Sequence, residues 1–218
     1  MIRHPKNTNL ILHYDNTYHG LSVQTEKGPL ISKYLESLYQ VISRALRDYS
    51  RVFAFRVDLR LPVDLELPDY AYTNEVIERF LGSVKAKIKN NRRRARQVNP
   101  YSHDSAVRYV WAREEGQHGR PHYHLAFLLN YEAFCSLGIF VAGRDNMFNR
   151  LQEAWASALD LSVEAVRGLV EIPINPCYRL KRGDDESLAN FFFRASYLCK
   201  AATKVYGDGL HGFGASRI

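Results

Sequence analysis

Apolar residues recur along the chain at two different spacings, and the order of the two patterns predicts a mixed fold. Apolar positions three or four residues apart predict helices over 29–49, 76–88, 148–159 and about 187–204. Alternating or continuous apolar runs predict strands over 52–61, 106–113, 121–129 and 168–174. Stretches rich in proline or charge predict loops at 62–72 and 179–187, and the glycine-rich end of the chain predicts irregular structure.

The order of these elements after residue 50 is strand, helix, strand, strand, helix, strand, and then a last helix. This is the order of the ferredoxin-like, or split β-α-β, fold, an α+β fold whose antiparallel sheet carries its helices on one face. We therefore expect an N-terminal helical extension over residues 1–50 and a main domain over residues 51–218 that ends in a C-terminal helix. The first and third strands of such a fold are neighbours at the centre of the sheet.

The two strands expected at the centre of the sheet both carry polar residues. The polar face of the first strand carries Arg56, Asp58 and Arg60. In the third strand His122 and His124 are two residues apart and therefore project from one face. Polar groups from both strands meet at the centre of the sheet, and this favours a binding site there.

The net charge of +7 comes from one segment of the chain. Residues 79–103 contain eight Lys and Arg residues and no acidic residue, whereas the rest of the chain carries 22 basic against 23 acidic side chains. We define the basic cluster as the seven cations Lys85, Lys87, Lys89, Arg92, Arg93, Arg94 and Arg96. Such a run is often only the solvated face of a helix, but here it carries the whole net charge and favours a polyanion, above all nucleic acid, as partner.

Composition and cysteine usage narrow the class of protein. A hydrophobic content of 46% is enough for a core, so a disordered chain is excluded. No apolar run has the length of a membrane span, and the polar start is unlike a signal peptide. Cys135, Cys177 and Cys199 match neither a disulfide framework nor a zinc knuckle. We expect a protein of a reducing cytoplasm that does not associate with membranes.

Two imidazoles on one strand face form a useful metal site only with a third ligand nearby. Glu114 ends the preceding strand, and a hairpin would fold it back beside His122. A carboxylate with two imidazoles suits Mn²⁺ or Mg²⁺ in a site with open positions, and zinc would also fit. The rivals for the third position are Glu115, Gln117 and His118. A bare His-x-His pair also occurs as ordinary core or surface material.

The spacing of these residues resembles the second motif of the HUH endonucleases, the initiators of rolling-circle replication. Glu114 is followed by seven residues and then by His122, Tyr123 and His124, and "GRPHYHLAF" is similar to that motif almost letter for letter. Tyr123 replaces the commoner aliphatic residue, and the first strand lacks the threonines usual in these enzymes. The resemblance implies a divalent-metal site with Glu114, His122 and His124 as the ligands.

A second resemblance lies near the end of the chain. The segments "SYLCKAATKVYGDG" and "FGASR" resemble the YagK/YfjJ group of replication proteins of inovirus-like prophages, with a likeness from about residue 50 to the C-terminus. HUH enzymes use a tyrosine nucleophile in a Tyr-x-x-Lys motif, which implies Tyr197 as nucleophile and Lys200 as its partner on a catalytic helix. Lys204 would follow near the same face. By itself Tyr197 would more often be a packing aromatic, and Tyr206 is the rival nucleophile.

The two resemblances imply an enzyme that nicks and rejoins single-stranded DNA through a 5′-phosphotyrosine during replication of a phage, prophage or related element in the bacterial cytoplasm. Arg56, Arg60, Lys204 and the basic cluster would bind the DNA, and Asp58 would orient a metal ligand or form a plain salt bridge. A host helicase and polymerase would be partners. The alternatives are a transposase or relaxase with the same chemistry, a non-catalytic single-stranded nucleic-acid-binding module, and an unrelated metal hydrolase.

Overall fold

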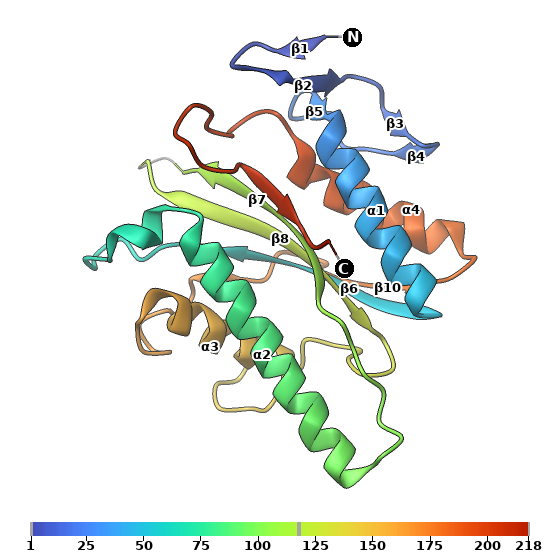
Figure 1. Cartoon of the computed structure of the whole chain (residues 1–218), viewed down its shortest axis with the longest axis vertical. Helices are drawn as coiled ribbons and strands as arrows, with labels where there is room; N and C mark the ends of the chain where they lie inside the picture. The colour runs from blue at the N-terminus through green and yellow to red at the C-terminus, as the bar shows by residue number, and fades with distance from the viewer. Residues whose placement is uncertain (1, 117–118, 218) are drawn as a thin grey trace.

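The computed structural model of the chain describes residues 2–116 and 119–217, and an antiparallel sheet lies at its centre (Figure 1). The strands of the sheet are β6 (Arg51–Leu59), β7 (Arg108–Glu115), β8 (Pro121–Asn130), β9 (Val170–Glu171), β10 (Cys177–Lys181) and β11 (Phe213–Ala215). The longer helices are α1 (Ser32–Asp48), α2 (Glu75–Val98), α3 (Met147–Leu159) and α4 (Asp185–Ser196). The predicted α+β class is confirmed. Among the helices of the described ranges, none is long and apolar enough to cross a membrane.

The strand order is β10-β6-β8-β7-β11, with β9 beside the end of β6 that β10 leaves unpaired. The first and third strands of the ferredoxin-like order, β6 and β8, are therefore central neighbours, as predicted. Asp58 of β6 lies opposite His124 of β8, and Glu114 of β7 lies opposite His122. This register gathers the polar residues of three strands at one end of the sheet.

Helices cover both faces of the sheet (Figure 1). α2 and α3, which connect strands, pack on the face that carries large apolar residues such as Phe55 and Phe127. α1 and α4 pack on the other face, where the strands present small residues such as Ala54, Ala112 and Ala126. Small side chains let a helix lie close to a sheet. The prediction that helices cover one face of the sheet therefore holds for α2 and α3 only. α1 and α4 cover part of the other face, which carries the polar residues of β6 and β8, so this part is not open to solvent.

Two segments that were predicted to be irregular form edge strands. β10 overlaps the expected charged loop at residues 179–181, where Arg179 and Lys181 are exposed and Leu180 is the one fully buried residue of the strand. β11 lies in the glycine-rich tail and pairs with β7. The strand expected over 168–174 is reduced to the two residues of β9.

The last helix ends earlier than predicted. α4 stops at Ser196, and a single 3-10 turn over Tyr197–Cys199 follows it. The chain leaves helical geometry at Lys200, whose ψ is 142°. The backbone N–H of Ala201 then donates to the carbonyl of Pro29 (2.9 Å), so a long-range contact replaces the next helical turn.

The first 50 residues contain more than the predicted helix. They also form the short strands β1 (Arg3–His4), β2 (Asn7–His13), β3 (Thr17–Tyr18), β4 (Leu21–Ser22) and β5 (Leu30–Ile31). α1 shares a hydrophobic core with α4 and with one face of the sheet. The domain boundary at residue 50 stays a prediction.

Trp155 of α3 should contribute strongly to stability. Its side chain is fully buried, its ring lies 5.8 Å from that of Phe80, and its Nε1–H donates to the carbonyl of Arg60 (2.8 Å). Trp155→Ala should lower the free energy of unfolding by about 3–5 kcal/mol, because it leaves a cavity. Urea denaturation measures this loss, with Tyr101→Ala, at a 90% exposed ring, as the control. A loss no larger than that of the control would contradict the packing role.

Candidate active site

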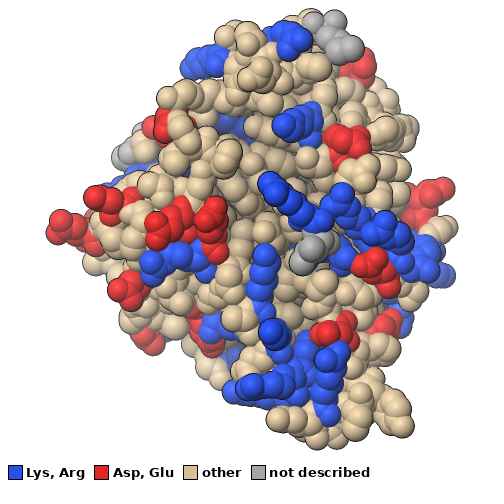
Figure 2. Space-filling model, in the orientation of Figure 1, with Lys and Arg blue, Asp and Glu red and all other residues tan. Residues whose placement is uncertain are grey.

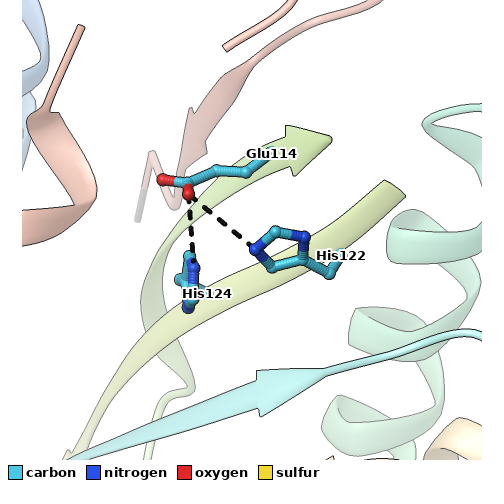
Figure 3. A group of neighbouring side chains, drawn as sticks. All are labelled: Glu114, His122 and His124. Carbon is cyan, nitrogen blue, oxygen red and sulfur yellow. Dashed lines mark ion pairs between the residues drawn. The ribbon is translucent and has the colours of Figure 1, made fainter. Parts of the chain in front are cut away.

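Three side chains from two adjacent strands meet at one end of the sheet (Figure 3). Oε2 of Glu114 lies 3.8 Å from Nε2 of His122 and 3.5 Å from Nε2 of His124. One ligand atom from each residue lies within 4.8 Å of the other two. The β7–β8 hairpin places Glu114 opposite His122, and the two-residue period of a strand puts His124 on the same face. The structure thus brings together the three residues that the sequence predicts as ligands.

The rival ligands do not belong to this group of three. Glu115 follows Glu114 on β7 and is exposed, so its side chain points to the opposite face of the sheet. Gln117 and His118, the other two rivals, lie outside the described residues.

The three side chains fit a divalent cation. Oε1 of Glu114 is buried and accepts no hydrogen bond from any residue in the described parts of the chain. A buried carboxylate oxygen without a hydrogen bond is costly. The ion pairs of Glu114 with Lys200 and Lys204 offset part of this cost, and a metal ion beside the carboxylate would offset more of it. One carboxylate and two imidazoles are a mixed set that leaves coordination positions open for phosphate oxygens. The group can therefore hold a metal ion and a substrate together.

Asp58 of β6 holds His124 in one orientation. Oδ1 of Asp58 lies 2.8 Å from Nδ1 of His124, and Nη2 of Arg56 donates to the same oxygen (3.1 Å). An imidazole that is held at Nδ1 presents its Nε2 to a metal ion. Arg56 is only 3% exposed, and its guanidinium lies 5.3 Å from the centre of the Tyr197 ring. In the structure Arg56 makes an internal contact that supports Asp58, and its predicted contact with a flanking phosphate stays a prediction.

Tyr197 and Lys200 border the same group. Nζ of Lys200 donates to Oη of Tyr197 (2.6 Å) and lies 3.0 Å from Oε2 of Glu114. The ring of Tyr197 meets that of His124 edge-on, with 5.4 Å between the ring centres. Residues three apart are eclipsed in a 3-10 turn, so the turn after α4 places Lys200 beside Tyr197. The ammonium of Lys200 consequently contacts both the phenol of Tyr197 and the carboxylate of Glu114.

Lys204 lies inside the site, next to Tyr197 and Lys200 as predicted, and its contact with DNA stays a prediction. Its side chain is buried, and Nζ lies 3.6 Å from Oε1 of Glu114, an ion pair without a hydrogen bond. Burial lowers the pKa of Lys204 to about 8, although the charge of Glu114 opposes this shift. The chain turns back after the 3-10 turn, with Thr203 in the left-handed region (φ 65°), and this brings Lys204 to Glu114.

Tyr206 is separated from the site. Its ring packs against His4 of β1, with 4.5 Å between the ring centres, and burial raises its pKa. It also packs against a small cluster that includes Leu10 and Ile31. These contacts favour a structural role for Tyr206 and leave Tyr197 as the tyrosine beside the predicted ligands.

The surroundings of Glu114 control the protonation of the predicted ligands. Burial alone would raise the pKa of Glu114, but the contact with His124 and the charge of Lys204 hold it well below its usual range. Burial lowers the pKa of His122, which is therefore neutral near pH 7. Burial would also lower the pKa of His124, yet the hydrogen bonds with Asp58 and Glu114 raise it overall. Protons therefore compete with a metal ion for His124 up to a higher pH than they do for His122.

The basic cluster lies far from this site. The Oη–H of Tyr123 donates to the carbonyl of Thr73 (3.0 Å), which places the start of α2 beside the ligand-bearing strand. α2 then runs 19 residues from Glu75 to Arg94, a rise of about 28 Å. Six of the seven members of the cluster are on the last half of this helix, and Lys85 is just before it; Figure 2 shows Lys and Arg side chains gathered on the lower part of this face.

Some members of the basic cluster form ion pairs with acidic residues, and others do not. Lys87 pairs with Glu153 (2.6 Å), and Arg96 pairs with Asp104 (2.8 Å). Within residues 2–116 and 119–217, the members that form no ion pair are Lys85, Lys89, Arg92, Arg93 and Arg94. Arg60, the other predicted surface contact, is exposed and pairs with Glu171 (2.8 Å).

The N-terminal segment supports the site in a way that no sequence motif indicated. Leu30 of β5 forms an isolated antiparallel bridge with Lys200, and Pro29 accepts the hydrogen bond from Ala201. On the other side, the backbone N–H of Glu115 donates to the carbonyl of Thr203 (3.2 Å). The segment that carries Lys200 is thus held between the N-terminal region and β7.

Comparison with known proteins places most of the chain in one family. The family model described as the YagK/YfjJ C-terminal domain matches residues 13–216. The uncharacterized protein YfjJ of Escherichia coli K12 is 32% identical over 207 residues, which cover 90% of this chain and 100% of the relative. The uncharacterized protein YagK of the same organism is 30% identical over 203 residues, or 89% of this chain and 97% of the relative.

A solved structure, the N-terminal nuclease domain of non-structural protein 1 of minute virus of mice, shows a much weaker similarity. It is 12% identical, with a TM-score of 0.24 over 74% of this chain and 70% of that chain. A likeness at this level carries no weight for fold or function.

Proposed function

The chain belongs to the YagK/YfjJ C-terminal domain family, and from this membership and the site geometry we propose that it is a metal-dependent endonuclease of the HUH type. It cleaves single-stranded DNA through Tyr197 and rejoins it by the reverse reaction. Glu114, His122 and His124 hold Mn²⁺ or Mg²⁺. The cellular role is the initiation of rolling-circle replication of a phage, prophage or related mobile element, with a host helicase and polymerase as partners.

One observation carries this proposal. The ammonium of Lys200 lies 2.6 Å from Oη of Tyr197 and 3.0 Å from Oε2 of Glu114, the oxygen that faces both histidines. The candidate nucleophile and its cationic neighbour come from the 3-10 turn after α4, the predicted metal ligands come from β7 and β8, and the two groups are in contact. An ordinary packing tyrosine needs no such arrangement.

Each of these side chains has its own role in the cleavage reaction. When bound, the divalent cation polarises the oxygens of the scissile phosphate and holds it in place. Oη of Tyr197 attacks the phosphorus, a bond forms between them, and the bond to the 3′ oxygen breaks. The phenol gives up its proton and the departing 3′ oxygen gains one, so that a 5′-phosphotyrosine and a free 3′-hydroxyl result. Lys200 stabilises the negative charge that develops on Oη, and Asp58 keeps His124 oriented throughout.

A covalent adduct tests the proposal directly. Labelled single-stranded DNA incubated with the protein and Mn²⁺ should yield a protein–DNA species that survives denaturation. A non-catalytic binding module gives no cleavage at all, and a water-using metal hydrolase cleaves without an adduct. A transposase or relaxase would form the same adduct, and the DNA sequence that it joins would distinguish these from a replication protein.

The basic cluster should contribute to DNA affinity but not to the cleavage step. Replacing Arg92, Arg93 and Arg94 with glutamine should flatten the slope of log affinity against log salt by about two units, at about 0.7 for each phosphate contact on a single strand. Titrations of DNA at several salt concentrations measure this slope. Cleavage of a short, saturating oligonucleotide should be unchanged, because these side chains lie about 26–28 Å along α2 from its start, and α2 covers the face of the sheet opposite to the predicted ligands.

Either of two results would contradict this expectation. A variant with the wild-type salt dependence would show that the cluster is only a solvated helix face. A variant that binds DNA normally but fails to cleave a short oligonucleotide would place these arginines in the cleavage machinery.

A further inference from the structure

A short apolar loop stands out on the surface next to α3. Residues 138–143 read Gly-Ile-Phe-Val-Ala-Gly, and we call them the apolar loop. Ile139 is 69% exposed, Phe140 is 53% exposed and Val141 is 51% exposed. Three consecutive large apolar side chains in water are unfavourable for folding, so their exposure suggests a binding role.

The apolar loop is held in a defined conformation. Nδ2 of Asn146 donates to the carbonyl of Ile139 (2.8 Å), and Nδ2 of Asn149 donates to the carbonyl of Val141 (2.9 Å). Gly138 has a φ of 84°, and a Cβ at this position would lie 2.6 Å from that of Asn146, so only glycine fits there. The fold therefore presents these apolar side chains at fixed positions.

Phe140 has one free ring face. Its ring stacks on that of Phe148, with 4.5 Å between the centres and 20° between the planes. The stack covers one face of Phe140, and the side chain remains about half exposed. A planar group can extend this stack on the open side.

A basic cleft lies between α2 and the segment that follows the apolar loop, and of the loop itself only Gly143 lines this cleft. The cleft has a volume of about 390 Å³, and its lining includes Lys87, Asn90, Arg94, Gly143, Arg144 and Arg150. Its two acidic side chains are engaged, since Arg150 pairs with Asp145 and Lys87 pairs with Glu153. In the part of the chain that the structure describes, Arg94 and Arg144 form no ion pair. Two cations from two elements are thus left for an external anion.

We propose that the basic cleft and the apolar loop together bind a second stretch of single-stranded DNA. Arg94 and Arg144 contact its phosphates, and an unpaired base stacks on the open face of Phe140. A cationic groove beside an aromatic ring is the combination with which proteins bind single strands without reading their sequence. The choice of DNA as the ligand rests on the proposed function, whereas the surface itself is separate from the metal site.

The distance to the metal site sets the length of DNA that can use both surfaces. The metal site lies on the face of the sheet that α1 and α4 cover, opposite to α2, and the rise of α2 from its start to Arg94 is about 28 Å. A stacked strand therefore needs more than about eight nucleotides to join the two surfaces. An oligonucleotide shorter than this reaches one surface at a time. A longer oligonucleotide can bind both surfaces at once. Its affinity should then increase by more than the added nucleotides alone would give.

The test measures DNA binding in EDTA, so that no strand is cleaved. Fluorescence anisotropy with oligonucleotides of increasing length should show a step in affinity at a length above about eight nucleotides. Phe140→Ser should remove the step and weaken the binding of long oligonucleotides by about tenfold, in keeping with one base–aromatic stack. A 2-aminopurine base in a long oligonucleotide should be quenched by the wild-type protein and not by Phe140→Ser. Tyr14→Ser, which removes a 55% exposed ring elsewhere, is the matched control and should change neither result.

The outcomes separate this inference from the proposed function. A protein that forms no adduct but shows the affinity step would overturn the nuclease proposal alone. A protein that forms the adduct without a step, or whose Phe140→Ser variant binds long oligonucleotides normally, would overturn this inference alone. If Phe140→Ser instead abolishes self-association in sedimentation velocity and leaves DNA binding intact, the apolar loop is a protein interface and the inference is wrong.

Discussion

Tyr197→Phe should abolish both DNA cleavage and adduct formation while leaving DNA affinity within about twofold of the wild type. The substitution removes only the Oη atom that is to attack phosphorus, so the rate should fall by at least about 10³-fold. The phenyl ring keeps its edge contact with His124 and its place beside Arg56. Denaturing gels measure cleavage and adduct, and anisotropy in EDTA measures binding.

Tyr206→Phe is the matched control for this prediction. Its ring lies against His4, and within residues 2–116 and 119–217 its buried Oη has no hydrogen-bond partner. Cleavage should therefore be retained. If Tyr206→Phe loses cleavage and Tyr197→Phe keeps it, the assignment of the nucleophile is wrong. Cleavage without an adduct in the wild type would point to water as the nucleophile.

Alanine at any one of the three predicted ligands should greatly weaken Mn²⁺ binding. Each substitution leaves two ligands, which are too few for a useful site, and we expect the affinity to fall by at least about 100-fold. Titration calorimetry of Glu114→Ala, His122→Ala and His124→Ala measures this loss. EDTA should stop cleavage by the wild-type protein, and added Mn²⁺ should restore it.

Glu115→Ala is the control, because Glu115 is the next residue on β7 and is exposed on the other face. It should bind Mn²⁺ as the wild type does. The affinity of the wild type should rise with pH through the raised pKa of His124, since this imidazole releases a proton when it binds a metal ion. If Glu114→Ala binds Mn²⁺ as tightly as the wild type does, the third metal ligand is Glu115, Gln117 or His118 and not Glu114.

Features that depend on local periodicity could be predicted from the sequence. Alternation along a strand places His122 and His124 on one face whatever surrounds them, and a short hairpin returns Glu114 to their side. The order of helical and alternating segments likewise predicted β6 and β8 as central neighbours. The binding of a metal ion by these residues stays a prediction.

Segments with little periodicity were harder to predict. β10 is an edge strand with one fully buried residue, and the three residues of β11 depend on their pairing with β7. The end of α4 was placed too late because the helical pattern continues past Ser196. Long-range contacts of the segment after Lys200 stop the helix, and these contacts leave no local signal.

The sequence alone determined the central pairing of β6 with β8, the three neighbouring ligand candidates, the Tyr-x-x-Lys pair and the existence of a basic cluster. Only the tertiary structure decided that Arg56 and Lys204 are interior side chains, which contact Asp58 and Glu114. It alone placed the basic cluster at the far end of α2 and the apolar loop beside it. The physical reason is that charge and spacing are properties of one segment, whereas burial and distance depend on which remote segments pack against it.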